Sequence, residues 1–155
     1  MLQHIDGIDY RQNIFLFLSN TGGKEITTTA LKNWSSGKQR EKISLKDLEP
    51  LVAAGAFNEE GGLQHSRMLE KNLVDVFVPF LPLERQHVKI CVRNEFERRQ
   101  ISWWTEAMVD TIADQLSYWP QEIKLFSTSG CKRIAQKVDL IEEEFEEKSE
   151  SRDEL

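Results

Sequence analysis

The feature that most constrains this chain is a short apolar run at residues 13–19, followed at once by the turn signal Asn-Thr-Gly-Gly at residues 20–23. Positions 14–18 are all apolar, so neither face of an extended strand would be polar there. Such a strand is typical of the middle of a parallel sheet, where helices cover both faces. A buried helix segment is the alternative, but the short length and the glycines favour the strand.

Before the prolines at 79 and 82, helices are expected between two extended segments, a mixed pattern of the α/β kind. A helix is expected over residues 24–34, and Ser35-Ser36-Gly37 ends it. A second helix opens at Ser44 and Asp47, which are spaced as in a capping box. Further along, residues 66–72 are expected to be helical and residues 74–78 to form a strand.

Pro79 and Pro82 end that strand and predict a hinge between two subdomains. After the hinge, helices are expected over residues 84–99, over residues 105–118 and from a cap at Ser129 onward, with a short strand over residues 123–126. From Glu142 the sequence is acidic and of low complexity, which predicts a frayed helix and then disorder. The expected fold class is therefore α/β leading into all-α.

The charge of the chain is concentrated at its carboxyl end. The 155 residues carry a net charge of −6, and residues 142–155, with eight acids and two bases, account for all of it. The remaining body is neutral, which argues against a basic nucleic-acid surface. No stretch approaches the ~18–20 apolar residues that span a bilayer. The first residues do not have the pattern of a signal peptide, and the three scattered histidines match no metal-ligand spacing.

A complete nucleotide-binding motif is missing from the sequence. A phosphate-binding loop requires G-x-x-x-x-G-K-[ST]. Neither Gly23-Lys24-Glu25 nor Gly37-Lys38-Gln39 has the upstream glycine and the following hydroxyl. No apolar strand ends in the acidic pair that would hold magnesium. The chain alone is therefore expected to hold no complete catalytic site.

Two polar residues lie where a phosphate group could be contacted. Asn20 follows the predicted central strand, at the edge where ligands bind to α/β sheets. Lys132 lies beside Gly130 and Cys131 at the predicted start of a helix, where free backbone amides attract anions. The simpler alternatives are that Asn20 only makes a turn and that Lys132 is an ordinary solvent-exposed lysine. The residues alone leave both alternatives open.

The cysteines and the carboxyl terminus carry two further signals. Cys91 and Cys131 suffice for one disulfide. Near a helix amino terminus Cys131 would be an unusually acidic thiol, and the alternative for each cysteine is a small buried residue. The last residues, Arg152-Asp153-Glu154-Leu155, differ from the retrieval signal Lys-Asp-Glu-Leu only at the first position. That ending predicts retrieval to the endoplasmic reticulum (ER).

Four stretches of the sequence together resemble the torsin family: residues 14–23 (IFLFLSNTGG), 36–41 (SGKQRE), 72–84 (NLVDVFVPFLPLE) and 126–132 (FSTSGCK). The resemblance runs from about residue 7 to about residue 140. The combination of Val-Pro-Phe-Leu-Pro-Leu with Gly-Cys-Lys is its most specific part. Torsins are AAA+ ATPases related to the Clp chaperones. The resemblance therefore implies an ATP-driven protein that remodels proteins or membranes in the ER lumen and nuclear envelope.

The resemblance also implies a division into segments and a role for several residues. Residues 1–83 would be the carboxy-terminal part of the AAA+ large α/β subdomain, with parallel-sheet strands and helices. Residues 84–141 would be the helical lid subdomain with its sensor-2 motif, and residues 142–155 an acidic tail with an ER-retrieval-like end. Asn20 would be the sensor-1 asparagine, near the γ-phosphate, and Lys132 the sensor-2 residue. Gly130-Cys131-Lys132 would be the family's redox-sensitive form of that motif, with Cys91 as the disulfide partner.

Cofactors and partners follow from the same resemblance. The full-length family member would use ATP and Mg²⁺, but neither is expected to bind tightly to this chain, which contains neither a Walker A nor a Walker B sequence. The implied partners are a membrane-anchored luminal activator and other torsin subunits. A second hypothesis is a truncated, non-catalytic lid protein that binds partners or regulates full-length subunits.

Overall fold

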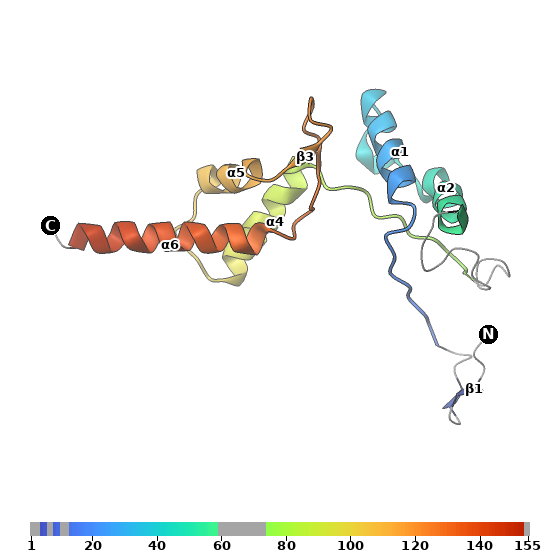
Figure 1. Ribbon diagram of the computed structural model, residues 1–155, viewed down its shortest axis with the longest axis horizontal. Coiled ribbons are helices and arrows are strands. Elements are labelled where there is room, and N and C mark those ends of the chain that lie inside the picture. The colour runs from blue at the N-terminus through green and yellow to red at the C-terminus, as the bar shows by residue number, and fades with distance from the viewer. Residues whose placement is uncertain (1–3, 6–7, 10–12, 59–73, 154–155) are drawn as a thin grey trace. The chain divides into compact units, whose positions relative to one another are not determined.

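The computed structural model describes residues 4–5, 8–9, 13–58 and 74–153, and the chain divides into two compact units, Met1–Pro79 and Phe80–Leu155. Figure 1 shows helices α1 and α2 in the first unit and helices α4, α5 and α6 in the second. Among the described residues, the helices are all too short or too polar to cross a membrane. The structure is mostly helical, with two small antiparallel sheets.

The first unit is built on two helices, α1 (Gly23–Ser35) and α2 (Leu45–Asn58), with the short 3-10 helix η1 (Arg40–Lys42) between them. Strands β1 (His4–Ile5) and β2 (Ile8–Asp9) pair with each other in antiparallel register. Because α1 and α2 each turn an apolar stripe toward the other, a small core forms between them. Its buried side chains are Ile26, Ala30, Leu48 and Val52.

Gly22 allows α1 and α2 to approach closely. Its φ of 75° lies in the left-handed region that favours glycine, and a Cβ atom there would lie 3.1 Å from Cγ1 of Val52. At the start of α2, the backbone N–H of Ser44 donates to Oδ2 of Asp47 at 3.0 Å, which confirms the predicted capping contact. The predicted positions of both helices are confirmed.

The two strands predicted in the first unit are wrong. Residues 13–20 and 74–79 have no regular secondary structure, and no parallel sheet is present among the described residues. Leu16 is 86 % exposed and Leu18 is 92 % exposed, where burial on both faces was expected. A strand has its backbone hydrogen bonds satisfied only by neighbouring strands, and the described chain provides none beside residues 13–20. The predicted helix over residues 66–72 lies outside the described residues.

The second unit contains α4 (Arg85–Arg98), α5 (Glu106–Asp114), β3 (Tyr118–Trp119), β4 (Phe126–Ser127) and α6 (Ile134–Asp153). Its core joins all three helices, because each carries apolar residues at three- or four-residue spacing. Fully buried members of this core include Val88, Val92, Phe96, Val109, Ile112 and Val138. The predicted helices over residues 84–99 and 105–118 are confirmed, the second ending earlier than expected.

Two features at the carboxyl end differ from the prediction. Helix α6 begins at Ile134 rather than at a cap on Ser129, because Gly130 has a φ of 57° that no α-helix accepts. The predicted short strand is displaced to β4, which pairs with β3 so that Trp119 lies opposite Phe126.

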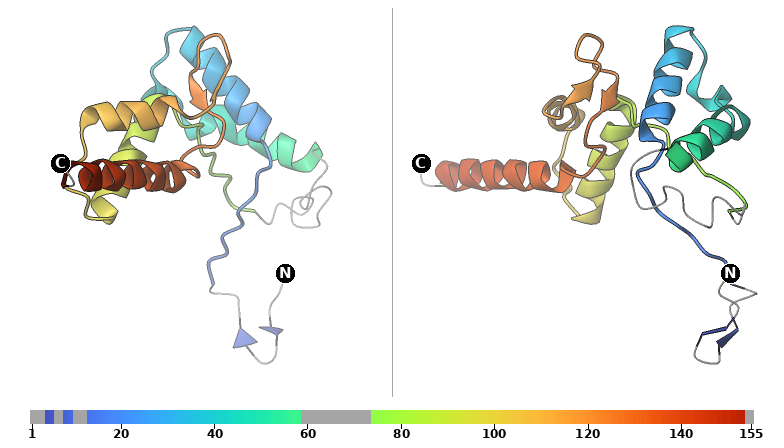
Figure 2. Two further views of the ribbon diagram at one scale, coloured as in Figure 1. Left: turned by 60° about the vertical axis from the view of Figure 1, so that its left-hand side comes forward. Right: turned by 45° about the vertical axis from the view of Figure 1, so that its right-hand side comes forward.

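The acidic tail is helical as far as Asp153, where a frayed helix and then disorder were expected. The guanidinium of Arg99, at the end of α4, forms ion pairs with Asp139 and Glu142 on α6. The ring of Phe145 stacks on Trp103, with centroids 3.9 Å apart. These contacts hold the first part of the tail, and the far end of α6 projects beyond α4 and α5 (Figures 1 and 2).

Helices α4 and α5 are also joined by a ladder of ion pairs. Arg85, Lys89 and Arg93 recur every four residues on α4 and face acids with the same spacing on α5. The acids, in reverse order because the helices run antiparallel, are Asp114, Asp110 and Glu106. Hydrogen bonds that the Arg85 guanidinium donates, first to Asp114 and then to Asp110, raise its pKa. These pairs are only partly buried, so solvent screening limits how much each stabilises the packing of the two helices.

Candidate functional site

The candidate site lies in the turn between β4 and α6, at Gly130, Cys131 and Lys132. The turn is tight: the backbone N–H of Lys132 donates to the Ser129 carbonyl at 3.3 Å, and that of Ile134 donates to the Cys131 carbonyl at 3.2 Å. At Gly130, an added Cβ would meet only Cδ1 of Leu83, at an ordinary 3.8 Å. The left-handed backbone, and not lack of space, therefore requires glycine at this position.

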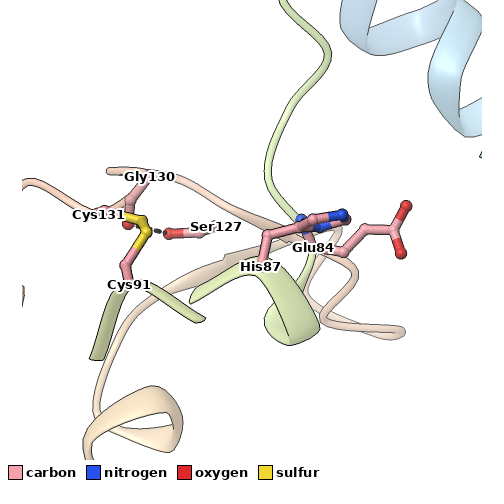
Figure 3. Close-up of a disulfide and its surroundings, with 6 residues drawn as sticks. All are labelled: Glu84, His87, Cys91, Ser127, Gly130 and Cys131. Carbon is pink, nitrogen blue, oxygen red and sulfur yellow. Dashed lines mark hydrogen bonds between the residues drawn. A yellow bond between two sulfur atoms is a disulfide. The ribbon is translucent and has the colours of Figure 1, made fainter. Parts of the chain in front are cut away.

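A disulfide between Cys91 and Cys131 ties this turn to α4. The two Cα atoms are 6.2 Å apart, within the usual range for a bridge, across a sequence separation of 40. Figure 3 shows the bridge between the middle of α4 and the turn. The predicted pairing is confirmed, and the alternative of two isolated buried thiols is excluded.

Lys132 is one of two exposed cations in the turn, where Arg133 follows it. The Lys132 side chain is exposed, and within the described part of the chain it has no ion-pair or hydrogen-bond partner. Cys131, immediately before it, is fixed to α4 by the bridge. The arrangement therefore offers an uncommitted positive charge on an anchored backbone, which suits contact with an anion.

Asn20 lies in the first unit, just before α1. Its backbone carbonyl accepts a hydrogen bond from the N–H of Gly23 at 3.3 Å, so it does form the turn that the simpler alternative required. Its side chain is exposed. The structure thus brings Cys91, Gly130, Cys131 and Lys132 together, whereas Asn20 belongs to the other unit and its role as a ligand-contacting amide stays a prediction.

The retrieval-like ending is described only in part. Arg152 and Asp153 form the end of α6, and Glu154 and Leu155 lie outside the described residues. Their proposed use as an address therefore stays a prediction.

Sequence reasoning missed Ser127, which lies beside the bridge in Figure 3. Its hydroxyl donates to the Gly130 carbonyl at 3.0 Å, and its backbone N–H donates to the Leu83 carbonyl at 2.8 Å. The signal that could have found it is a hydroxyl residue directly after the apolar Leu125-Phe126 and three residues before a glycine. That spacing suits a side chain that folds back onto a turn.

A second contact in the same region fixes the start of α4. The backbone N–H of Glu84 donates to Nδ1 of His87 at 3.1 Å, so the imidazole serves as the acceptor at this helix end (Figure 3). Glu84 also forms an isolated antiparallel bridge with Phe126. The residues that lead into α4 are therefore attached to β4 next to the candidate site.

The second unit is thus a small helical domain with an antiparallel hairpin, whose last helix follows a disulfide-anchored turn. A sequence model of the family described as "Torsin-1A, C-terminal domain" matches residues 83–140, which cover α4, α5, the hairpin and the start of α6. A protein of Caenorhabditis elegans named "Torsin-like protein" is 41 % identical over 138 residues, which make up 88 % of this chain and 39 % of that relative. The chain belongs to the torsin family and corresponds to its carboxy-terminal part. The resemblance first seen in the sequence is confirmed.

Proposed function

We propose that this chain is the carboxy-terminal portion of a torsin-type AAA+ ATPase that acts in protein or membrane remodelling in the ER lumen and nuclear envelope. Residues 1–83 would complete the large α/β subdomain, and residues 84–141 would form the helical lid. The observation that carries the proposal is the Cys91–Cys131 bridge beside Lys132, inside the segment that matches the torsin domain.

In this proposal Lys132 senses nucleotide from the lid. Its exposed ammonium group, on a turn anchored by the bridge, would contact a phosphate group, and Asn20 would orient a phosphate oxygen or a water. ATP and Mg²⁺ would supply the reactive phosphoryl group and its charge neutralisation in the whole protein. Neither is expected to bind tightly to these 155 residues, which contain no phosphate-binding loop.

The redox state of the bridge would regulate this sensor. Reduction by a dithiol, which is itself oxidised to a disulfide, would convert the bridge to two thiols and release Cys131 from α4. The turn that carries Lys132 would then be held less firmly, and nucleotide contact would weaken. By linkage, bound nucleotide would change the redox equilibrium of the bridge to the same extent.

The experiment that tests the proposal is a chimera. The matching carboxy-terminal segment of the nematode torsin-like protein is replaced by this chain, and ATP binding and hydrolysis are measured with the luminal activator present. Lys132→Ala is expected to weaken both, whereas Lys137→Ala, one turn into α6, should behave as the unaltered chimera. Equal activity of the Lys132→Ala and Lys137→Ala chimeras would overturn the sensor role.

A second candidate function is a non-catalytic lid protein that binds partners or regulates full-length subunits, and the helical second unit, which has its own buried core and matches the torsin carboxy-terminal domain, favours it. The two candidates are separated by adding the 155-residue chain in trans to a full-length torsin. Inhibition or complex formation without any gain in hydrolysis supports the regulatory candidate. No interaction with the torsin or its membrane-anchored activator excludes it.

The location is tested through the carboxyl terminus. A signal peptide is fused to the chain, and secretion is compared with and without Arg152-Asp153-Glu154-Leu155. Deletion should increase secretion several-fold if the ending is a retrieval signal. Unchanged secretion would show that these four residues do not act as a retrieval signal.

A further inference from the structure

Ser127 is the buried polar side chain that the proposed function leaves unused. It is 9 % exposed, and among the described residues it is the polar side chain that falls in the buried class. A buried hydroxyl is tolerated when it is hydrogen-bonded, and here it donates to the Gly130 carbonyl at 3.0 Å. That hydrogen bond ties Ser127 to the disulfide, because Gly130 immediately precedes the bridged Cys131.

The backbone of Ser127 makes a second hydrogen bond, to the segment that enters the second unit. Its backbone N–H donates to the Leu83 carbonyl at 2.8 Å, next to the antiparallel bridge between Glu84 and Phe126. Leu83 belongs to the segment through which the chain enters the second unit. One residue therefore joins that entering segment to the turn that holds the disulfide.

We propose that Ser127 is a positioning residue that couples the redox state of the Cys91–Cys131 bridge to the segment entering the second unit at Leu83. With the bridge closed, Cys131 is held to α4, and the Gly130 carbonyl stays within reach of the Ser127 hydroxyl. When the bridge is reduced, that anchor is lost, the acceptor moves, and the strand contact of Ser127 with Leu83 loosens with it. The coupling needs no nucleotide. Only its consequence for Lys132 rests on the proposed function.

The test measures the redox equilibrium of the bridge in the 155-residue chain against glutathione. In that reaction two glutathione molecules are oxidised to one glutathione disulfide, and Cys91 and Cys131 become two thiols. Ser127→Ala removes a hydrogen bond that favours the closed form. The equilibrium should shift toward the dithiol about three- to tenfold. That shift corresponds to a potential less negative by about 15–30 mV.

The matched control is Thr128→Ala. Its hydroxyl also donates to a backbone carbonyl in the same hairpin, that of Ser117 at 3.2 Å, but it does not contact the turn. The redox equilibrium of this control should stay within about twofold of that of the unaltered chain. The Thr128 hydroxyl does not bond Gly130, so its hydrogen bond is expected to be the same in both redox forms. A Ser127→Ala equilibrium within about twofold of the unaltered chain, or an equal shift in both variants, overturns the proposal.

Hydrogen exchange of the unaltered chain provides a measurement that needs no variant. The Ser127 amide is expected to be protected when the bridge is closed and to exchange at least about tenfold faster after reduction, whereas the Val92 amide within α4 should change much less. Equal protection of the Ser127 amide in both redox states contradicts the coupling, even if Ser127→Ala fails to fold. Neither measurement involves ATP, so a failed sensor role for Lys132 would not affect the result.

Discussion

The two units differ in where their apolar side chains lie. In the second unit the apolar residues of α4, α5 and α6 are buried against one another, whereas in the first unit the longest apolar run of the sequence, residues 14–18, is exposed. A helix satisfies its own backbone hydrogen bonds and needs only a covered face, but a strand needs both neighbours and covered faces. The helices of both units therefore bury their apolar faces, whereas residues 14–18, which have no neighbouring strand among the described residues, leave theirs exposed.

The largest expected loss of stability comes from truncating a core side chain of the second unit. Phe96→Ala should destabilise the second unit by about 3–5 kcal/mol, because the ring is 0 % exposed and its removal leaves a cavity. Leu16→Ala, at an exposed position, should change stability by less than about 0.5 kcal/mol. Helical circular dichroism during urea unfolding follows both units, and tryptophan fluorescence in a Trp34→Phe background reports the second alone, which contains Trp103, Trp104 and Trp119. A cost for Leu16→Ala similar to that of Phe96→Ala would mean that residues 14–18 are packed in solution.

Removal of the disulfide should have the next largest effect, and only in the second unit. Replacing Cys91 and Cys131 by alanine should destabilise that unit by about 3–4 kcal/mol, because a loop closed across 40 residues is freed in the unfolded chain. Thermal unfolding of the same Trp34→Phe protein measures the change. Under strong reducing conditions the unaltered chain should approach the double variant. If it stays as stable as the oxidised form, the bridge contributes little.

Gly22 gives a smaller effect that should be confined to the first unit. Gly22→Ala should destabilise the packing of α1 against α2 by about 1–3 kcal/mol, because an alanine there is strained in the left-handed region and crowds Val52. Gly23→Ala is the control, since an added Cβ at that position meets nothing within 4 Å. Helical circular dichroism during thermal unfolding, together with Trp34 fluorescence, separates the two variants. Equal stability of both would mean that α1 and α2 can move apart at little cost.

The smallest predicted effect is a pH dependence in the second unit. Hydrogen bonds from Arg98 and then Arg99 lower the pKa of the Glu95 carboxyl from its ordinary 4.5 to about 2. Because this pKa is depressed in the folded state, its contribution is complete above about pH 4.5 and is lost as the pH falls toward 2. Arg98 is largely exposed, so screening by solvent keeps the contribution to about 1 kcal/mol or less.

Glu95→Gln should therefore flatten the acid limb of a stability–pH curve between pH 5 and 2, measured by urea unfolding at each pH. Glu97→Gln, at an exposed position on the same helix, should leave that limb as it is. An unchanged acid limb in Glu95→Gln would show that other carboxyl groups carry the acid sensitivity.

The sequence predicted best the features that depend on local patterns. Three-residue and four-residue spacing placed α1, α2, α4 and α5, and the capping contact of Ser44 with Asp47 placed the start of α2. The pairing of Cys91 with Cys131 came from the family resemblance, and the structure confirms it. Spacing alone could not have brought these two residues together, because their contact depends on how α4 packs beside the turn.

The features that depend on distant partners were missed. Residues 13–19 have the composition of a buried strand, but composition does not supply the neighbouring strand that hydrogen bonding requires. The helical tail was missed for the opposite reason. Its acidic sequence suggested solvation, whereas Arg99 and Trp103, more than thirty residues upstream, contact it. Ser127 was missed because its importance comes from Gly130 and Leu83, which only the folded hairpin brings beside it.

The long α6 has a mechanical consequence for whatever follows or is attached to its end. Phe145 is stacked on Trp103, and the helix continues from there to Asp153. At 1.5 Å per residue this overhang is a stiff arm of about 12 Å. A protein that engages the end of α6 near Asp153 would therefore meet it at a distance from the core of the second unit. Shortening the arm by two turns would change access to that end without altering its four-residue ending.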